Sequence, residues 1–379
     1  MRVEQTSWTA AHGWAPHPPG ALGASAQLLL LFGERSVLRD PRQLEVLRQA
    51  YPSARLLGCS TAGEICGDRV SDDSLVATAV AFEHTEIRGA QTPIQGVQDS
   101  FGAGERLSEA LPHDGLVHVF VLSEGIGVNG SALVAGLSRR LPAGVSVTGG
   151  LAGDGDRFEE TLAFWDDAPG RNVVAAVGLY GPRIRVGFGS LGGWDPFGPE
   201  RLVTRSDGNV LYELDGRSAL ELYRTYLGHH AKDLPASALV FPLCVRARES
   251  DVPVVRTVLA IDEAGESLSF AGDVPEGALA RFMKANFDRL VDGATGAART
   301  SHEPLGPSPP ELAILISCVG RKRVLKQRVE EEVEAVREVL GPQTVLGGFY
   351  SYGELSPFTP SGRCELHNQT MTVTTLAEV

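Results

Sequence analysis

The sequence GCSTAGE at residues 58–64 returns near the other end of the chain as GFYSYGE at residues 348–354. The two stretches align without a gap and end in the same Gly-Glu pair. A shorter version, GGLAGD, lies between them at residues 149–154. Self-similarity of this kind indicates an internal repeat, and the glycines predict a tight turn in each copy.

Each turn ends a strand, helix and strand in that order. An apolar run predicts a buried strand, a helical stretch follows, and a second apolar run leads into the turn. These parts are expected at 27–32, 41–50 and 54–58; at 116–122, 131–141 and 145–148; and at 312–317, 324–340 and 344–346. Strand-rich sequence follows every turn. The predicted fold class is therefore α/β, with repeated βαβ-plus-strands units that form mixed sheets flanked by helices.

The length of 379 residues favours two domains. Residues 1–23 mix Trp, His, Pro and Gly without periodicity, and we expect an irregular lead-in there. A first domain is expected over residues 24–215 and a second over residues 216–379. Residues 219–295 carry weaker helix and strand patterns, so they form either a divergent fourth unit or an insertion.

Composition excludes several classes of protein. The formal net charge is -13, and no basic stripe that would bind nucleic acid or an anionic membrane is present. No apolar run approaches the roughly 20 residues that a membrane-spanning helix needs, and the N-terminus lacks the order of a signal peptide. The five cysteines include no CxxC pair, which argues against a disulfide framework or a zinc ribbon. We expect a cytoplasmic protein with reduced thiols.

The repeated turns are the first candidate for chemistry. Glycine at the end of an inner strand allows positive φ and lets a ligand approach backbone N–H groups, while an adjacent carboxylate adds an acceptor. This interpretation selects Thr61, Glu64, Asp154, Ser351 and Glu354. The alternative is that the glycines only make turns and the carboxylates only cap the chain that follows.

A second motif, GIGVNG at residues 125–130, has the GxGxxG form, follows a predicted strand and opens a helix. A dinucleotide site would also need an acidic residue about 20 positions further on. The next strand instead ends in Thr148 and two glycines, which argues against NAD. The phosphate-loop, HExxH and GxSxG motifs are missing from the sequence.

Two cysteines could support a thiol enzyme. Cys59 lies in the first turn, and Cys318 precedes Arg321, which could lower the pKa of the thiol. A buried, inert thiol is the alternative for both.

His367 lies in the polar stretch CELHNQT at residues 364–370. Polar side chains within strand-rich sequence need partners or a ligand. A hydrogen-bonded structural histidine is one interpretation, and an axial haem ligand is the other.

Several of these stretches resemble the signature sequences of the FIST family of sensor proteins. They are LLGCSTAGEI at 56–65, GGLAGDG at 149–155, ISCVGR at 316–321, GGFYSYGELSP at 347–357 and CELHNQTMT at 364–372. The resemblance implies an N-terminal and a C-terminal FIST domain that sense small ligands, with amino acids suggested, in proteins that work with histidine kinases or cyclases. Some related proteins are described as binding haem and sensing nitric oxide.

From the residues and the resemblance together we expect a non-enzymatic sensor for an amino acid or related metabolite. It would act through a separate signalling protein, because the sequence carries no transmitter or cyclase segment after the second domain. Haem, with His367 as its ligand, is the alternative cofactor. The expected ligand-binding residues are Cys59, Ser60, Thr61, Gly63, Glu64, Gly149, Gly150, Asp154, Ser317, Cys318, Arg321, Tyr350, Ser351, Gly353, Glu354, His367 and Asn368.

Overall fold

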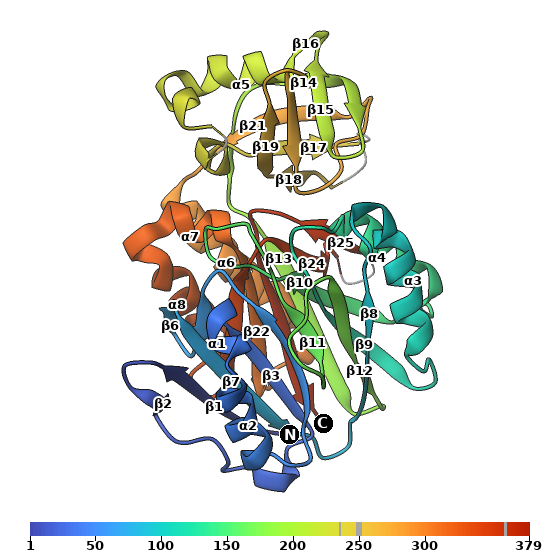
Figure 1. Cartoon of the computed structure of the whole chain (residues 1–379), viewed down its shortest axis with the longest axis vertical. Coiled ribbons are helices and arrows are strands. Elements are labelled where there is room, and N and C mark those ends of the chain that lie inside the picture. The colour runs from blue at the N-terminus through green and yellow to red at the C-terminus, as the bar shows by residue number, and fades with distance from the viewer. Residues whose placement is uncertain (235, 248–251, 360–361) are drawn as a thin grey trace.

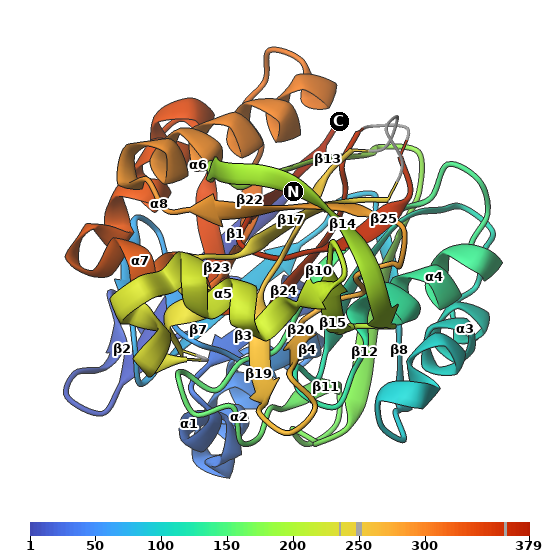
Figure 2. The same ribbon diagram turned by 90° about the horizontal axis from the view of Figure 1, so that it is seen from above.

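The repeated apolar runs form the inner strands of three mixed sheets, which make up the larger body of the molecule (Figure 1). The structure is a computed structural model that describes residues 1–234, 236–247, 252–359 and 362–379. Within these residues each of the three sheets has six strands. A smaller body with an eight-stranded sheet lies over one end of the larger body (Figures 1 and 2).

The first sheet has the strand order β11-β4-β3-β7-β1-β2. Its strands are β1 (Arg2–Thr9), β2 (Gly13–Ala15), β3 (Leu28–Gly33), β4 (Arg55–Ser60), β7 (Ser74–Ala81) and β11 (Ala163–Trp165). Helices α1 (Arg35–Arg39) and α2 (Pro41–Ala50) connect β3 to its parallel neighbour β4. Helix α2 begins where the sequence predicts, because the Asp40 side chain accepts from the N–H of Arg42 and Pro41 suits the first turn.

The second sheet has the order β25-β24-β10-β9-β12-β8, and the third has the order β13-β26-β22-β23-β5-β6. The strands of the second are β8 (Glu86–Pro93), β9 (Leu116–Ser123), β10 (Ser146–Leu151), β12 (Val173–Tyr180), β24 (Gly353–Pro357) and β25 (Cys364–His367). The strands of the third are β5 (Glu64–Cys66), β6 (Arg69–Ser71), β13 (Ile184–Leu191), β22 (Leu312–Cys318), β23 (Val345–Ser351) and β26 (Met371–Glu378).

Helices cover the outer faces of these two sheets (Figure 1). Helices α3 (Ser100–Ala110) and α4 (Gly130–Arg140) pack together beside the second sheet, and α6 (Phe287–His302), α7 (Val319–Leu325) and α8 (Val329–Leu340) lie beside the third. The 3₁₀ turns are η1 (Gly23–Ser25), η2 (Val97–Asp99), η3 (Gly228–Asp233), η4 (Ala236–Val240), η5 (Glu303–Leu305) and η6 (Lys326–Arg328). In the described part of the chain, no helix is long and apolar enough to cross a membrane.

All three sheets share one topology at their centres, which confirms the predicted α/β fold with repeated units. Two parallel strands are followed by an antiparallel third strand in β3-β4-β7, β9-β10-β12 and β22-β23-β26. In every unit a residue just ahead of the third strand has a positive φ. The value is 55° at Asp73 and 53° at Asn172, each directly before its strand, and 63° at Gln369, two residues before β26. Such values are uncommon for residues other than glycine, so the match reflects a shared backbone path.

The three units exchange strands in a closed circle. The strand that follows the first turn, β5, pairs with β23 of the third unit. The strand after the third turn, β24, pairs with β10 of the second unit, and β11 returns from the second unit to β4 of the first. Each unit therefore contributes a strand to the sheet of another unit.

Strand β1 belongs to the first sheet, so the expected irregular lead-in over residues 1–23 is wrong. All eight residues of β1 pair antiparallel with β7. This places the N-terminus beside the last strand, where the Met1 ammonium lies 3.2 Å from Glu311 and 3.4 Å from Glu378. The sequence pattern does not predict this strand. Most of its residues are only half-buried, so apolar and polar residues do not alternate clearly.

The smaller body is an insertion in the third unit. Its sheet order is β18-β17-β21-β14-β15-β20-β19, with β16 beside β15. Its elements are β14 (Asp195–Asp207), β15 (Val210–Leu214), β16 (Arg217–Ser218), α5 (Ala219–Leu227), β17 (Leu243–Arg246), β18 (Val254–Arg256), β19 (Val258–Asp262), β20 (Ser267–Phe270) and β21 (Leu279–Lys284). We call residues 195–284 the inserted body and the rest the core. Strand pairing does not follow the division expected near residue 215, because β14 pairs with β21 and β15 pairs with β20 across it.

Candidate functional site

The three repeated turns converge at the end of the core that faces the inserted body. The N–H of Ala62 donates to the carbonyl of Tyr350 at 2.8 Å, and the N–H of Tyr352 donates to Leu151 at 3.2 Å. The N–H of Gly153 donates to Ser60 at 2.9 Å, so each turn bonds the next in a ring. The three turns therefore lie side by side.

The two repeated glutamates are internal clasps. Glu64 accepts from the Thr61 hydroxyl and, at 2.6 Å, from the Ser74 hydroxyl. Glu354 repeats the arrangement, with Ser351 at 2.6 Å and the Thr370 hydroxyl at 3.0 Å. Both carboxyls are fully buried, and burial raises the pKa of each to about 8. They fasten the first turn to the beginning of β7 and the third turn to the residue before β26, which is the antiparallel third strand of the unit in each case.

The turn glycines are packed against neighbouring strands. Gly149 has a φ of 152°, and a Cβ there would overlap the carbonyl oxygen of Val121. A Cβ at Gly150 would meet Ile316, and one at Gly353 would meet Leu151 and Leu366. Gly63 has a φ of 134°, and a Cβ there would overlap the ammonium of Lys322. These glycines allow strands to approach one another, and their backbone is not open to a ligand.

Arg321 belongs to a buried network in the third unit. Its guanidinium pairs with Glu332 at 2.7 Å and donates to the carbonyl of Leu290 at 2.7 Å. Glu332 also accepts from the hydroxyls of Ser317 at 2.9 Å and Tyr350 at 2.7 Å. All four side chains are buried, so the network ties α7 and α8 to the sheet.

Neither candidate thiol is activated. Cys59 and Cys318 are buried, and burial raises the pKa of both thiols well above the usual value. A thiol nucleophile needs the opposite shift. The arrangement therefore does not favour a thiol enzyme.

His367 does not fit an axial haem ligand. Its ring is buried, lies 4.0 Å from the Phe358 ring, and uses Nε2 in a 2.8 Å hydrogen bond to the Ser356 carbonyl. Burial lowers the pKa of His367 to about 4, so the ring stays neutral. Its neighbour Asn368 is fully buried, and neither atom of its amide has a partner in the described residues.

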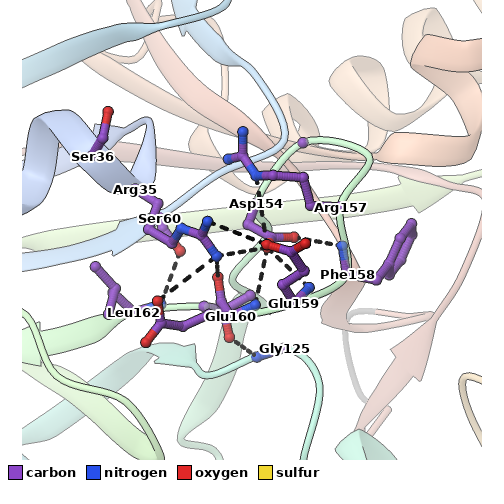
Figure 3. A network of polar contacts seen from close by, with 12 residues as sticks. Arg35, Ser36, Ser60, Gly125, Asp154, Arg157, Phe158, Glu159, Glu160 and Leu162 are labelled. Carbon is purple, nitrogen blue, oxygen red and sulfur yellow. Dashed lines mark hydrogen bonds and ion pairs between the residues drawn. The ribbon is translucent and has the colours of Figure 1, made fainter.

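Asp154 organises a loop in place of a clasp (Figure 3). Its carboxylate accepts from three successive N–H groups, those of Phe158 at 2.9 Å and of Glu159 and Glu160 at 3.0 Å. It also accepts from the Tyr352 hydroxyl and pairs with Arg35 at 3.3 Å. This loop holds Phe158 at a φ of 53°, a strained value for a bulky residue.

The strained loop places an aromatic pair at the edge of a cavity. The rings of Phe158 and Tyr352 stack with centroids 4.3 Å apart and planes 11° apart. They line a cavity of about 250 Å³ between the core and the inserted body. The other lining residues are Val97, Gly125, Ile126, Val128, Asn129 and Leu151 from the core, and Asn209, Leu259, Phe270 and Ala271 from the inserted body.

A larger groove of about 980 Å³ also lies between the two bodies, with α4, β18 and β25 among its walls. None of the turn residues lines it. The smaller cavity contains residues of the second and third turns and is the better candidate.

Comparison with known families identifies the chain. The FIST N domain model matches residues 27–217, and the FIST C domain model matches residues 219–357. The chain belongs to the FIST family. FIST domains are associated with small-ligand sensing in signal transduction. The two matches meet inside the inserted body, just after β16 begins.

Relatives of this FIST protein include an uncharacterized protein of Mycobacterium tuberculosis, 27% identical over 92% of this chain and 90% of the relative. An uncharacterized protein of Methanocaldococcus jannaschii is 23% identical, over 81% of this chain and 62% of its own length. Among solved structures, the cyanuric acid hydrolase from A. caulinodans aligns with 100% of this chain and 98% of its own at 10% identity, with a TM-score of 0.37.

The residues that line the cavity of the FIST protein differ from those that the sequence predicts as ligand-binding. Tyr352 sits inside the third turn, and Asn129 belongs to the GxGxxG stretch that had been considered only for dinucleotides. No sequence pattern marks Phe158 or Asn209 as a ligand-binding residue, because single aromatic residues in loops and single asparagines in hairpins are common. None of the predicted ligand-binding residues lines the cavity in the described part of the chain, and among them Asp154 holds its wall through Phe158 and Tyr352.

Proposed function

We propose that this protein is a small-molecule sensor whose ligand binds in the 250 Å³ cavity between the core and the inserted body. One observation carries the proposal: the cavity lies where the ring of turns meets the inserted body, and both bodies line it. Four exposed large hydrophobic side chains, Val97, Ile126, Phe158 and Leu259, gather there. Exposed apolar surface that is concave and concentrated favours a ligand site.

A ligand in this cavity would act on the seam between the two bodies. Asn129 donates to Asp273 at 2.8 Å, and Arg256 donates to the Leu366 carbonyl at 3.0 Å across this seam. Gln369 donates to the Thr257 hydroxyl at 3.0 Å. A ligand that touches both bodies stabilises the arrangement that binds it and shifts the population of relative positions. That shift is the signal in this proposal.

The expected ligand is an amino acid or related metabolite. The expected signalling partner, which responds to the shift, is a separate histidine kinase or cyclase. The association of FIST domains with signal transduction supports the second part. We place the protein in the cytoplasm, and all five of its cysteines are unpaired, as that location would keep them.

A thermal-shift screen over amino acids and related metabolites tests the proposal. A ligand at 100 times its Kd should stabilise the protein by about 2.7 kcal/mol. Leu259→Ala should weaken the response, whereas Leu202→Ala should not. The two leucines are both 44% exposed on strands of the inserted body, but only Leu259 lines the cavity. A screen without any stabilising compound, or equal loss in both variants, would contradict the proposal.

A further inference from the structure

The walls of the 250 Å³ cavity are uncharged. Its lining within the described residues consists of aliphatic and aromatic side chains, glycine, and the amides of Asn129 and Asn209. A free amino acid carries an ammonium and a carboxylate, and each would have to leave water without an opposite charge to meet it. Burying an unpaired charge is far more costly than burying a neutral polar group.

No carboxylate lines the cavity within the described residues, but Asp154, Asp273 and Glu124 are each hydrogen-bonded to residues that do. Asp154 is fully buried and is saturated by three N–H groups, the Tyr352 hydroxyl and Arg35. Asp273 accepts from Asn129, the N-cap residue of α4. The negative charge of Asp273 therefore already lies beside the N-terminus of α4, where a ligand carboxylate would otherwise be favoured. Glu124 keeps Oε1 without a partner in the described residues, and burial raises the pKa of its carboxyl, which favours the neutral form. The lining itself therefore offers a ligand ammonium or carboxylate no opposite charge.

Two stacked aromatic rings form part of the cavity wall. Phe158 stacks on Tyr352 and remains 36% exposed. The Tyr352 hydroxyl already donates its only proton to Asp154 and accepts from the Asp154 N–H at 3.2 Å. Phe270 lines the cavity from the inserted body. Stacked or edge-to-face contacts with such rings favour a planar aromatic ligand over a saturated one.

The two asparagines supply neutral hydrogen-bonding groups. Asn209 uses one N–H to hold the Phe270 carbonyl at 2.7 Å, and its Oδ1 has no partner in the described part of the chain. Asn129 gives one N–H to Asp273, and its Oδ1 accepts from Ala132 at 3.0 Å. A side-chain amide has two N–H groups and two lone pairs, so both residues keep capacity for a ligand. An amide group on the ligand matches that capacity.

We propose that the cavity binds an uncharged, planar aromatic compound with an amide-like group, in preference to a free amino acid. The inference rests on the proposed sensor function and narrows its ligand class. The ring extends the stack of Phe158 and Tyr352, while the amide meets Asn129 and Asn209. The ligand then bridges the core and the inserted body through neutral contacts.

Four probes that share one carbon skeleton test this by titration calorimetry on the full chain. They are 3-phenylpropanamide, 3-phenylpropanoate, phenylalanine and 3-cyclohexylpropanamide, which are neutral, anionic, zwitterionic and non-planar in turn. We expect 3-phenylpropanamide to bind at least about tenfold more tightly than each of the others. Phe158→Leu should remove most of that preference for the phenyl over the cyclohexyl ring, and Leu202→Ala should leave it intact.

The possible outcomes separate the two proposals. Tighter binding of phenylalanine or 3-phenylpropanoate overturns the uncharged class, and equal binding of the cyclohexyl amide overturns the aromatic one. A charged or aliphatic metabolite that stabilises the protein in a Leu259-dependent way also overturns this inference while it supports the sensor function. Failure of every probe and every metabolite removes both proposals.

Discussion

The two glutamate clasps predict an unusual dependence of stability on pH. In the folded protein the pKa of Glu64 and of Glu354 is about 8, because burial disfavours the carboxylate. In the unfolded chain both groups ionise near pH 4.5. Between these values the folded state holds protons that the unfolded state has released, so the free energy of unfolding falls as pH rises.

Two buried histidines oppose this trend only at lower pH. Burial lowers the pKa of His118 to about 3 and that of His367 to about 4. The unfolded chain takes up these protons below about pH 6.5, which raises stability as pH increases up to that point. Above pH 6.5 the glutamates dominate. Each should account for between about 1 and 2 kcal/mol of lost stability between pH 6.5 and pH 8.

The double variant Glu64→Gln and Glu354→Gln should remove most of this dependence. A glutamine reproduces the protonated clasp, since its carbonyl accepts from the N–H of Ser74 or Thr370 while its amide donates to Thr61 or Ser351. Urea denaturation followed by circular dichroism at pH 6.5 and pH 8 measures the change, with the exposed Glu45→Gln as control. If the double variant loses as much stability as the wild type over this interval, the folded carboxyls are ionised and the reasoning fails.

Three further predictions concern the supporting structure. Arg321→Met should destabilise the protein by about 3 to 5 kcal/mol, because it leaves Glu332 buried and unpaired. Adding Glu332→Leu should restore much of the lost stability. A double variant that is no more stable in urea than the single variant would contradict this. Asp154→Ala should cost about 1 to 3 kcal/mol, because three N–H groups lose their acceptor, and should weaken any Leu259-dependent ligand by releasing Phe158; unchanged calorimetric affinity would argue against that link. Gly149→Ala should destabilise far more than Gly115→Ala, since both have positive φ but only Gly149 faces a backbone carbonyl; similar shifts in melting temperature would show that φ alone matters.

Much of the core could be predicted because the repeat carries its own signals. The parallel strands are continuous apolar runs, and the turns are marked by glycine. The exchange of β5, β24 and β11 between units could not be predicted, because it depends on which sheet edge a short strand meets and such strands carry only three to five residues. Strand β1 was missed for a related reason, since half-buried residues leave little alternation to detect.

The sequence predicts neither the residues that line the candidate cavity nor the contacts that the turn carboxylates make. Polar residues at the turns suggested contact with a ligand, yet Glu64 and Glu354 face hydroxyls of their own units. A sequence cannot distinguish a carboxylate that meets a ligand from one that meets a serine ten residues away, because both are buried and both need partners. The inserted body was the other obstacle, since its residues reach the cavity only through long-range packing.

The departure of one unit from the repeat explains where the cavity lies. In the first and third turns a glycine precedes the glutamate clasp, and a strand begins at once in β5 and β24. In the second turn the ring of hydrogen bonds places Asp154 at the position of Gly63 and Gly353. No clasp follows, and a loop of eight residues at 155–162 precedes β11.

This loop is the reason that Phe158 can reach Tyr352 of the third turn. In the first and third turns the carboxylates of Glu64 and Glu354 bind strands of their own units. In the second turn Asp154 instead holds a strained aromatic residue, Phe158, beside the cavity. Local strain persists only where the surrounding structure enforces it, and such positions concentrate at functional sites. A chain in which residues 155–162 are shortened to the length of the other turns should therefore keep the core fold but lose the aromatic wall, and with it the aromatic preference of the cavity.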